Sequence, residues 1–332
     1  MKKSVGSIRD VAKDTGLSIA TISRVMNSVA NVSPKTRKTV LEACERLDYM
    51  PNPAARALST SKSKMVAAII PTIEHSVFAK FVAAIERTLS EQGYTLVLAV
   101  SNSDADEEQR AARKLLGMGA QAFILSGAVH RQDLIEMFER RDVPFVFTSV
   151  WAETADKPTI GYDNARLAAD AVRYLVDCGH TEIGVIHGPL VESDRTRARK
   201  QGAQTMAAIA NLTYFETPLS VHGGKLAVRK VFEASSGITA LLCFSDVLAL
   251  GAYFGLMKAG KCIPDDISVM GFDNLDWSAD AEPALTTIDL PASDMGRAVA
   301  QQIMDSLENN GTLHTHQLEA NIMERASVRK IG

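Results

Sequence analysis

The chain has 332 residues, 46% of them hydrophobic and 23% charged, which is the composition of a globular protein and at this length predicts two or three domains. No apolar run follows the opening lysines or approaches the roughly 20 residues that span a bilayer, so we expect a cytoplasmic protein without a secretory signal or a membrane partner. The net charge of −3 is unevenly distributed: residues 1–64 carry 12 Lys and Arg against 5 Asp and Glu, and the rest carries 24 against 34. A basic head on an acidic body indicates a polyanionic partner for the head, although a merely solvated basic face would look the same.

Three short helices are predicted in the first fifty residues. Ser7 caps the first, which Gly16 ends, and Ser18 opens the second. In the second helix Ile22, Val25 and Met26 share one face and are expected to be buried. Ser33 and Pro34 begin the third helix, whose expected core residues are Val40, Leu41, Cys44 and Leu47. Two helices joined by a tight turn and followed by a third form an all-α helix-turn-helix domain over residues 1–50.

The opposite face of the second helix has the chemistry of DNA recognition. Arg24 can bind a guanine edge with two hydrogen bonds, and Ile19 and Ala20 can touch thymine methyl groups. Hydroxyl and amide groups near helix starts can hold phosphates. The candidates for phosphate contacts are Ser7, Ser18, Thr21, Ser23, Asn27 and Thr36. Each alone would be an ordinary polar surface residue, but their clustering in a basic segment favours DNA binding.

Residues 51–64 are predicted to form a hinge helix and linker. Asn52 and Pro53 are a helix start, but a helix of about two turns is too short to be stable alone. It should therefore form only against a partner, with Ala55 and Leu58 at the DNA and Leu58 as a wedge in the minor groove. The alternative is an ordinary linker with one capped turn.

Two runs in this region, SIRDVAKDTGLSIATISRVMN and VSPKTRKTVLEACERLDYMPNPAARALST, closely resemble the head and hinge of the lactose/galactose-repressor (LacI/GalR) family. The resemblance implies that the second helix lies in the major groove and that Leu58 of two paired hinge helices enters the minor groove. It further implies a homodimer, with a tetramer left open. The expected target is palindromic double-stranded operator DNA resembling TGnAAnCGnTTnCA.

Beyond residue 64, apolar β-rich runs alternate with amphipathic helical stretches, which predicts doubly wound parallel sheets in two lobes. The predicted strands are 65–71, 94–101, 122–126, 144–149, 182–187, 240–245 and 267–273, and the predicted helices are 78–92, 107–118, 165–178, 195–209 and 247–259. Ligands of such sheets collect at the carboxyl ends of strands, which here carry Ser126, Ser149, Ser245, Asp246, Asp273 and Asn274. The scattered Cys44, Cys178, Cys243 and Cys262 are expected to be reduced core residues.

The resemblance continues along the α/β body in the motifs CGHTEIGVIHGP, SDVLALG, IPDDISVMGFDN and PALTTIDLPASDMG. It implies a two-lobed core similar to periplasmic sugar-binding proteins, with one lobe of residues 65–161 and 291–322 and another of residues 162–290 and 323–332. A small-molecule effector is then expected between the lobes. The implied effector-binding residues are Phe78, Ser126, Ser149, Trp151, Arg199, Asp246, Asp273 and Trp277. Arg199 as a solvated helix residue and Trp151 as a core residue remain alternatives.

Two departures from the family pattern bear on the identity of the effector. Thr148 and Ser149 stand where many members have an acidic residue, and the segment 74–78 lacks a frequent Asn-Pro pair. The segment before Phe78 and the GYDN run resemble gluconate-responsive members, which points to a sugar or sugar acid.

Other functions fit the sequence less well. The run from Gly117 to Ala122 matches a loose dinucleotide-binding pattern, but it follows a helix and precedes a strand, the reverse of the required order. Without other catalytic motifs we expect no enzyme and no cofactor, and His314 and His316 lack a third metal ligand. A pure solute-binding protein would fit the body but not the basic head.

Overall fold

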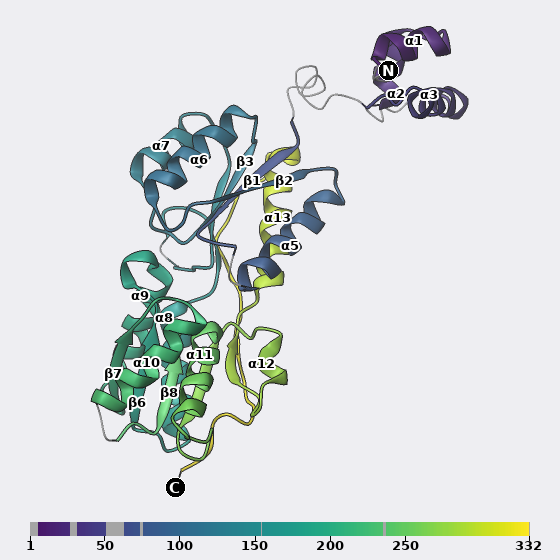
Figure 1. Cartoon of the computed structure of the whole chain (residues 1–332). Coiled ribbons are helices and arrows are strands. Elements are labelled where there is room, and N and C mark those ends of the chain that lie inside the picture. The colour runs from purple at the N-terminus through teal and green to yellow at the C-terminus, as the bar shows by residue number, and fades with distance from the viewer. Residues whose placement is uncertain are drawn as a thin grey trace. The chain divides into compact units, whose positions relative to one another are not determined.

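The computed structural model describes residues 6–26, 32–50, 63–73, 76–153, 155–234 and 237–331. The chain divides into two compact units, residues 1–64 and 65–332, which we call the head and the body (Figure 1). Among the described residues no helix is both long and apolar enough to cross a membrane.

The head consists of α1 (Ile8–Thr15), α2 (Ile19–Met26) and α3 (Pro34–Arg46). Its small core contains Val11, Ile22, Val25, Val40 and Cys44. The buried stripe of the second helix is as the sequence predicts, with Met26 partly buried beside it. The prediction for Leu41 is wrong: its side chain is 49% exposed, because Val40, Ala43 and Cys44 already occupy the buried face of α3.

The body contains two six-stranded sheets, each of which carries one lobe. The first lobe has strand order β11-β5-β4-β3-β1-β2. Its strands are β1 (Met65–Ile70), β2 (Thr95–Val100), β3 (Ala122–Ser126), β4 (Phe145–Thr148), β5 (Thr159–Gly161) and β11 (His316–Gln317). On one face α5 (Ser76–Ser90) packs against α13 (Ala292–Asn309), and on the other lie α6 (Ala105–Gly117) and α7 (Gln132–Glu139) (Figure 1).

The second lobe has strand order β12-β10-β9-β8-β6-β7, in which only the β10–β12 pair is antiparallel. Its strands are β6 (Glu182–His187), β7 (Asn211–Glu216), β8 (Ala240–Cys243), β9 (Ser268–Phe272), β10 (Thr286–Asp289) and β12 (Asn321–Met323). Its helices are α8 (Asn164–Asp177), α9 (Asp194–Gln204), α10 (Val221–Ala234), α11 (Asp246–Lys258) and α12 (Trp277–Asp280), with a 3-10 turn η1 (Leu190–Glu192). The chain passes between the two sheets three times, after β5, after β10 and after β11.

The central strands are almost wholly buried, as expected where helices cover both faces of a parallel sheet. The predicted helix over 195–209 ends earlier, at Gln204. Three cysteines are buried as predicted, but Cys262 is exposed, because it lies in the loop that follows α11 rather than in the core.

Candidate functional site

In the head, α2 presents to solvent the residues expected to read bases. Ile22 and Val25 point into the core and are at most 2% exposed, which leaves Ile19, 46% exposed, Ala20 and Arg24 on the outer face. The helix is fixed at its start because the Ser18 hydroxyl oxygen accepts a hydrogen bond from Thr21 N at 3.1 Å. A short apolar pair and an exposed arginine therefore share one accessible surface.

Two further polar candidates of the head, Ser7 and Thr36, lie at helix starts. Ser7 caps α1 in a capping box, in which Asp10 Oδ2 accepts from Ser7 N at 2.8 Å. Thr36 N donates to the Ser33 hydroxyl at 3.1 Å at the start of α3. Ser23 is half-buried, and Asn27, Ala55 and Leu58 lie outside the described residues. These hydroxyls thus have a structural role beside any contact with phosphate.

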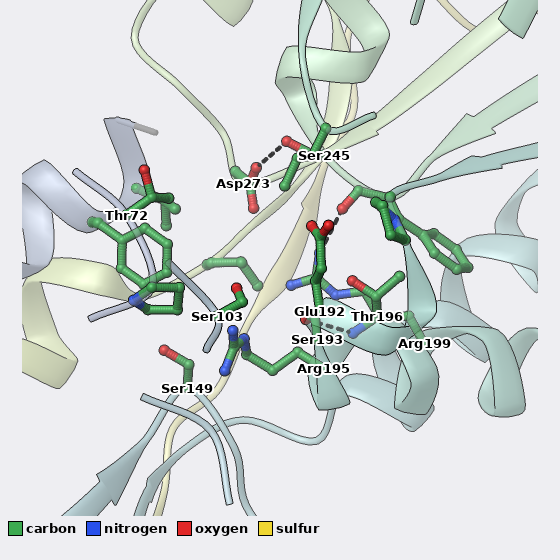
Figure 2. Close-up of a pocket in the computed structure, with 18 of the residues that line it drawn as sticks. Thr72, Ser103, Ser149, Glu192, Ser193, Arg195, Thr196, Arg199, Ser245 and Asp273 are labelled. Atoms are coloured by element: carbon green, nitrogen blue, oxygen red, sulfur yellow. Dashed lines mark hydrogen bonds between the residues drawn. The ribbon is translucent and has the colours of Figure 1, made fainter. Parts of the chain in front are cut away.

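In the body a cavity of about 410 Å³ opens between the two lobes. The first lobe contributes residues after β1, β2 and β4 and the start of α5, and the second contributes η1, α9 and the ends of β8 and β9. Four of the predicted effector-binding residues line it, Phe78, Ser149, Arg199 and Asp273. In Figure 2 Arg195 and Arg199 enter from the α9 side, and Thr72 lies on the opposite side. The cavity therefore combines cationic, anionic, hydroxyl and aromatic groups.

Arg199 is held rigidly at the wall of this cavity. The residue is only 7% exposed. Its Nε donates a hydrogen bond to Asn164 Oδ1 at 3.0 Å, and its Nη1 donates one to the Phe244 carbonyl oxygen at 2.6 Å. The guanidinium carbon also lies 4.0 Å from the centre of the Phe272 ring. These contacts exclude the alternative of a solvated helix residue.

Asp273 follows β9 and carries the carboxylate of the cavity. Its Oδ2 accepts a hydrogen bond from the Ser245 hydroxyl at 2.9 Å. Burial raises the pKa of Asp273 to about 7, although the charge of Arg199 opposes this shift. The carboxyl group can therefore either accept or donate a hydrogen bond near neutral pH.

The structure does not bring the other four predicted residues to this cavity. Asp246 has no exposed surface, and its carboxylate accepts from Leu275 N at 2.9 Å, Ser278 Oγ at 2.6 Å and Thr287 Oγ1 at 2.6 Å. It fixes the loop that carries Asp273 instead of facing a ligand. Trp277 packs on the core of the second lobe.

Trp151 and Ser126 also lie apart from the cavity lining. Trp151 is half-buried in the loop after β4. Ser126 lines a smaller side chamber of about 170 Å³, which shares Ser193 and Arg195 with the main cavity. Its position at the end of β3 is as expected, and its buried hydroxyl oxygen has no hydrogen-bond partner.

Sequence reasoning missed several cavity residues, above all Arg195. A signal was available, because residues four apart share one face of a helix and Arg195 precedes Arg199 by four positions in α9. Asn102, Ser103 and Phe244 gave no comparable signal. Among the described residues, no group of three His, Cys, Asp or Glu side chains could hold a metal ion, and His314 Nε2 lies 3.1 Å from Gln302 Nε2.

The chain combines a helix-turn-helix head with a two-lobed α/β body that has a cavity between its lobes. This combination is typical of DNA-binding regulators that respond to a small molecule. The family described as "Bacterial regulatory proteins, lacI family" matches residues 7–52, and the one described as "Periplasmic binding proteins and sugar binding domain of LacI family" matches residues 63–324. The chain therefore belongs to the LacI family of bacterial regulators.

Known relatives agree over almost the whole chain. Catabolite control protein A of Priestia megaterium is 32% identical over 92% of this chain and 94% of its own. The HTH-type transcriptional repressor PurR of Aliivibrio salmonicida is 27% identical over 98% of this chain and all of its own. The crystal structure of the lac repressor dimer bound to operator and the anti-inducer ONPF matches with a TM-score of 0.87 and 26% identity. The match covers 98% of this chain and 99% of the lac repressor chain.

These findings confirm the expected fold and class. The protein is a DNA-binding transcriptional regulator with the effector-binding core domain of its family.

Proposed function

We propose that the protein represses transcription in the cytoplasm as a homodimer on a palindromic operator, under control of a sugar or sugar acid bound between the lobes. The observation that carries the proposal is the cavity between the two lobes. Its lining includes Arg195, Arg199, Asp273, Phe78 and several hydroxyl groups. Carboxylates and guanidinium groups bind paired hydroxyls, and an aromatic ring suits the apolar face of a sugar.

The two arginines favour an effector that carries a carboxylate. A guanidinium group can bind a carboxylate with two parallel hydrogen bonds, and such bonds are about twice as strong as neutral ones. Arg195 and Arg199 approach from the same helix, α9, whereas Asp273 stands at the end of β9. An extended sugar acid would place its acid group at α9 and a hydroxyl group at Asp273.

On the DNA side, we propose that Arg24, Ile19 and Ala20 read bases and that the hydroxyls of Ser7, Ser18, Thr21, Ser23 and Thr36 approach phosphates. The exposure of α2 supports this assignment. The related lac repressor was solved as a dimer on its operator, which supports a dimeric arrangement. We further propose that residues 51–64 form the hinge and that Asn27, Ala55 and Leu58 act at the DNA.

A thermal-shift comparison of three compounds with one carbon skeleton tests the effector class. We expect D-gluconate to raise the melting temperature of the body more than D-glucose or D-glucitol, because only gluconate offers a carboxylate. A ligand at a hundred times its Kd stabilises the folded state by about 2.7 kcal/mol. Arg199→Ala and the milder Asp273→Asn should lose this shift.

The matched control is Arg229→Ala, which removes an arginine from the surface of the same lobe, where its side chain is 73% exposed. It should keep the full shift. Equal shifts with gluconate and glucitol would contradict the acid, and no shift with any sugar or sugar acid of a broad panel would contradict the effector site.

A further inference from the structure

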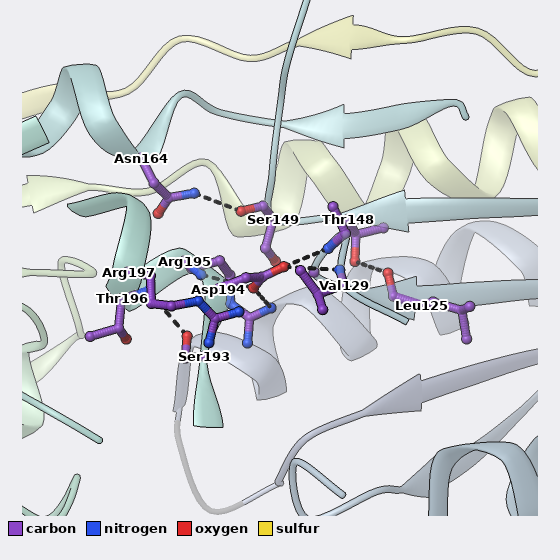
Figure 3. Close-up of polar contacts among 12 residues, drawn as sticks. Leu125, Val129, Thr148, Ser149, Asn164, Ser193, Asp194, Arg195, Thr196 and Arg197 are labelled. Carbon is purple, nitrogen blue, oxygen red and sulfur yellow. Dashed lines mark hydrogen bonds and ion pairs between the residues drawn. The ribbon is translucent and has the colours of Figure 1, made fainter. Parts of the chain in front are cut away.

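The side-chain carboxylate of Asp194 forms hydrogen bonds from one lobe to the other beside the effector cavity. Asp194 is the first residue of α9 in the second lobe, and its Oδ2 accepts hydrogen bonds from two backbone N–H groups of the first lobe, Ala128 N at 2.6 Å and Val129 N at 3.2 Å (Figure 3). Both donors lie in the loop that follows β3. We call this contact between Asp194 and the two N–H groups the clasp.

Each side of the clasp is fixed by its own lobe. In the second lobe the Ser193 hydroxyl accepts from Thr196 N at 3.2 Å, and Arg197 Nη1 donates to the Leu190 carbonyl oxygen at 2.6 Å. In the first lobe His130 Nδ1 lies 2.9 Å from Glu108 Oε2 and its Nε2 lies 3.1 Å from the Gly127 carbonyl oxygen. The two surfaces are therefore shaped for this contact within each lobe.

The shape of the loop also fits the carboxylate closely. Gly127 has φ +94°, which other residues rarely adopt, and a Cβ placed there would lie 2.7 Å from Arg195 Nη1 and 2.8 Å from Asp194 Oδ2. The positive φ favours glycine, and a Cβ here would press against the ends of the Arg195 and Asp194 side chains. Gly127 is thus a second, independent component of the same contact.

The clasp also holds a cavity residue. Asp194 Oδ1 accepts from Arg195 Nη1 at 3.2 Å and from Arg195 N at 2.8 Å. The two side chains are 16% and 13% exposed, so water screens their charges little. Burial alone would raise the pKa of Asp194, but Arg195 and the N–H groups of Ala128 and Val129 hold it below its ordinary value.

A second charged contact between the lobes is weaker by comparison. Lys80 of α5 forms an ion pair with Asp276 at 2.7 Å, but the Asp276 side chain is 90% exposed. Exposed pairs of this kind contribute little, because water and salt screen them. Of these two charged contacts, the clasp is the one that can hold the lobes together.

We propose that Asp194 is a positioning residue for the effector cavity: it holds the two lobes closed before an effector binds and keeps Arg195 at the cavity wall. This inference rests on the proposed function in taking the cavity as the effector site. Apparent affinity falls with the fraction of molecules in the binding-competent state, so a preformed closed arrangement strengthens effector binding.

Hydrogen exchange in the full-length, effector-free protein tests the clasp directly. Mass spectrometry of peptides that contain Ala128 and Val129 reports on the two N–H groups that Asp194 binds. Asp194→Asn removes the charge, and we expect exchange at these positions to accelerate by about tenfold, because hydrogen bonds to charged groups are the stronger class. Gly127→Ala should have the same effect from the other lobe, without changing any charge.

The control is Glu233→Gln, which removes one carboxylate charge from the surface of the same lobe, where the side chain is 69% exposed. It should leave the exchange unchanged. Peptides from β3 and β6 should stay protected in every variant, which shows that both lobes remain folded. Slow exchange at Ala128 and Val129 in both Asp194→Asn and Gly127→Ala would overturn the proposal, as would fast exchange in the unmodified protein.

Calorimetry with D-gluconate on the same samples separates this inference from the proposed function. Absence of binding to the unmodified protein would count against the sugar acid, while the exchange rates alone decide on the clasp. If gluconate binds, its Kd should rise in both clasp variants and stay constant in Glu233→Gln. An unchanged Kd in variants with fast exchange would overturn the positioning role.

Discussion

Two residues of the cavity have backbone conformations that non-glycine residues rarely adopt. Ser149 has φ 65° after β4, and Asp273 has φ 122° after β9. Such conformations cost about 1–3 kcal/mol each and persist only where the surroundings fix them. Asn164 Nδ2 donates to the Ser149 carbonyl oxygen at 2.9 Å, and Ser245 binds the Asp273 carboxylate. The strain coincides with one point in each lobe at which a polar side chain lines the cavity.

The pKa of Asp273 predicts a dependence of stability on pH. Because its folded-state pKa of about 7 exceeds the ordinary value of about 3.9, the folded protein binds this proton more tightly than the unfolded chain does. The resulting stabilisation is complete below about pH 4 and is lost as the pH rises through about 7, by at most about 1.4 kcal/mol per pH unit. Denaturant unfolding between pH 5 and 8 should show this loss relative to Asp273→Asn.

Burial also raises the pKa of Asp246, and its charge acts on Asp273, so the pH dependence belongs to the two carboxyl groups together and should weaken in Asp273→Asn. Parallel pH profiles for the two proteins would contradict the assignment.

At the scale of elements, glycines set the spacing between α10 and α11. A Cβ at Gly251 would lie 2.2 Å from the Val221 carbonyl oxygen and 2.8 Å from the Gly224 Cα. Gly251→Ala must push the helices apart, and we expect it to lower the free energy of unfolding by about 1–3 kcal/mol in chemical denaturation. Gly117 lies at the end of α6, and a Cβ added there would meet no atom within 4 Å outside its chain neighbours and its own helix backbone. Gly117→Ala should therefore raise the free energy of unfolding, by up to about 1 kcal/mol. Equal effects of the two substitutions would refute this account.

The sequence predicted the elements whose signal is local. β3 is an almost continuous apolar run and β6 has an apolar centre between Glu182 and His187, and both strands were predicted with the bounds that the structure shows. The helix α10 was missed because its paired glycines obscure its periodicity, and β7 because it is an edge strand with polar residues at both ends. The site was predicted less completely. Asp246 and Asp273 both follow strands, and only tertiary packing decides which carboxylate is enclosed by hydrogen-bond donors and which lines the cavity.

For the whole molecule, control of DNA binding requires that an effector distinguish two arrangements of the lobes. A ligand shifts an equilibrium only by its differential affinity for the two states. The cavity meets this condition because Ser149 and Phe78 belong to one lobe and Arg199 and Asp273 to the other. Typical coupling free energies are about 1–3 kcal/mol, which would change operator affinity several-fold to a hundredfold.

The head should divide its contacts between base reading and charge attraction. Arg24 lies exposed on α2, and Lys38 lies on α3 with its side chain 78% exposed, 3.8 Å from Glu42. Selection from random DNA should return a palindrome with the unmodified protein and a relaxed consensus with Arg24→Ala, because a bidentate base contact contributes about 1–3 kcal/mol of discrimination. Lys38→Ala should keep the consensus and weaken binding to all sequences alike, with a shallower salt dependence. Equal losses on operator and random DNA for Arg24→Ala would remove it from base recognition, and a consensus without two-fold symmetry would exclude the dimer.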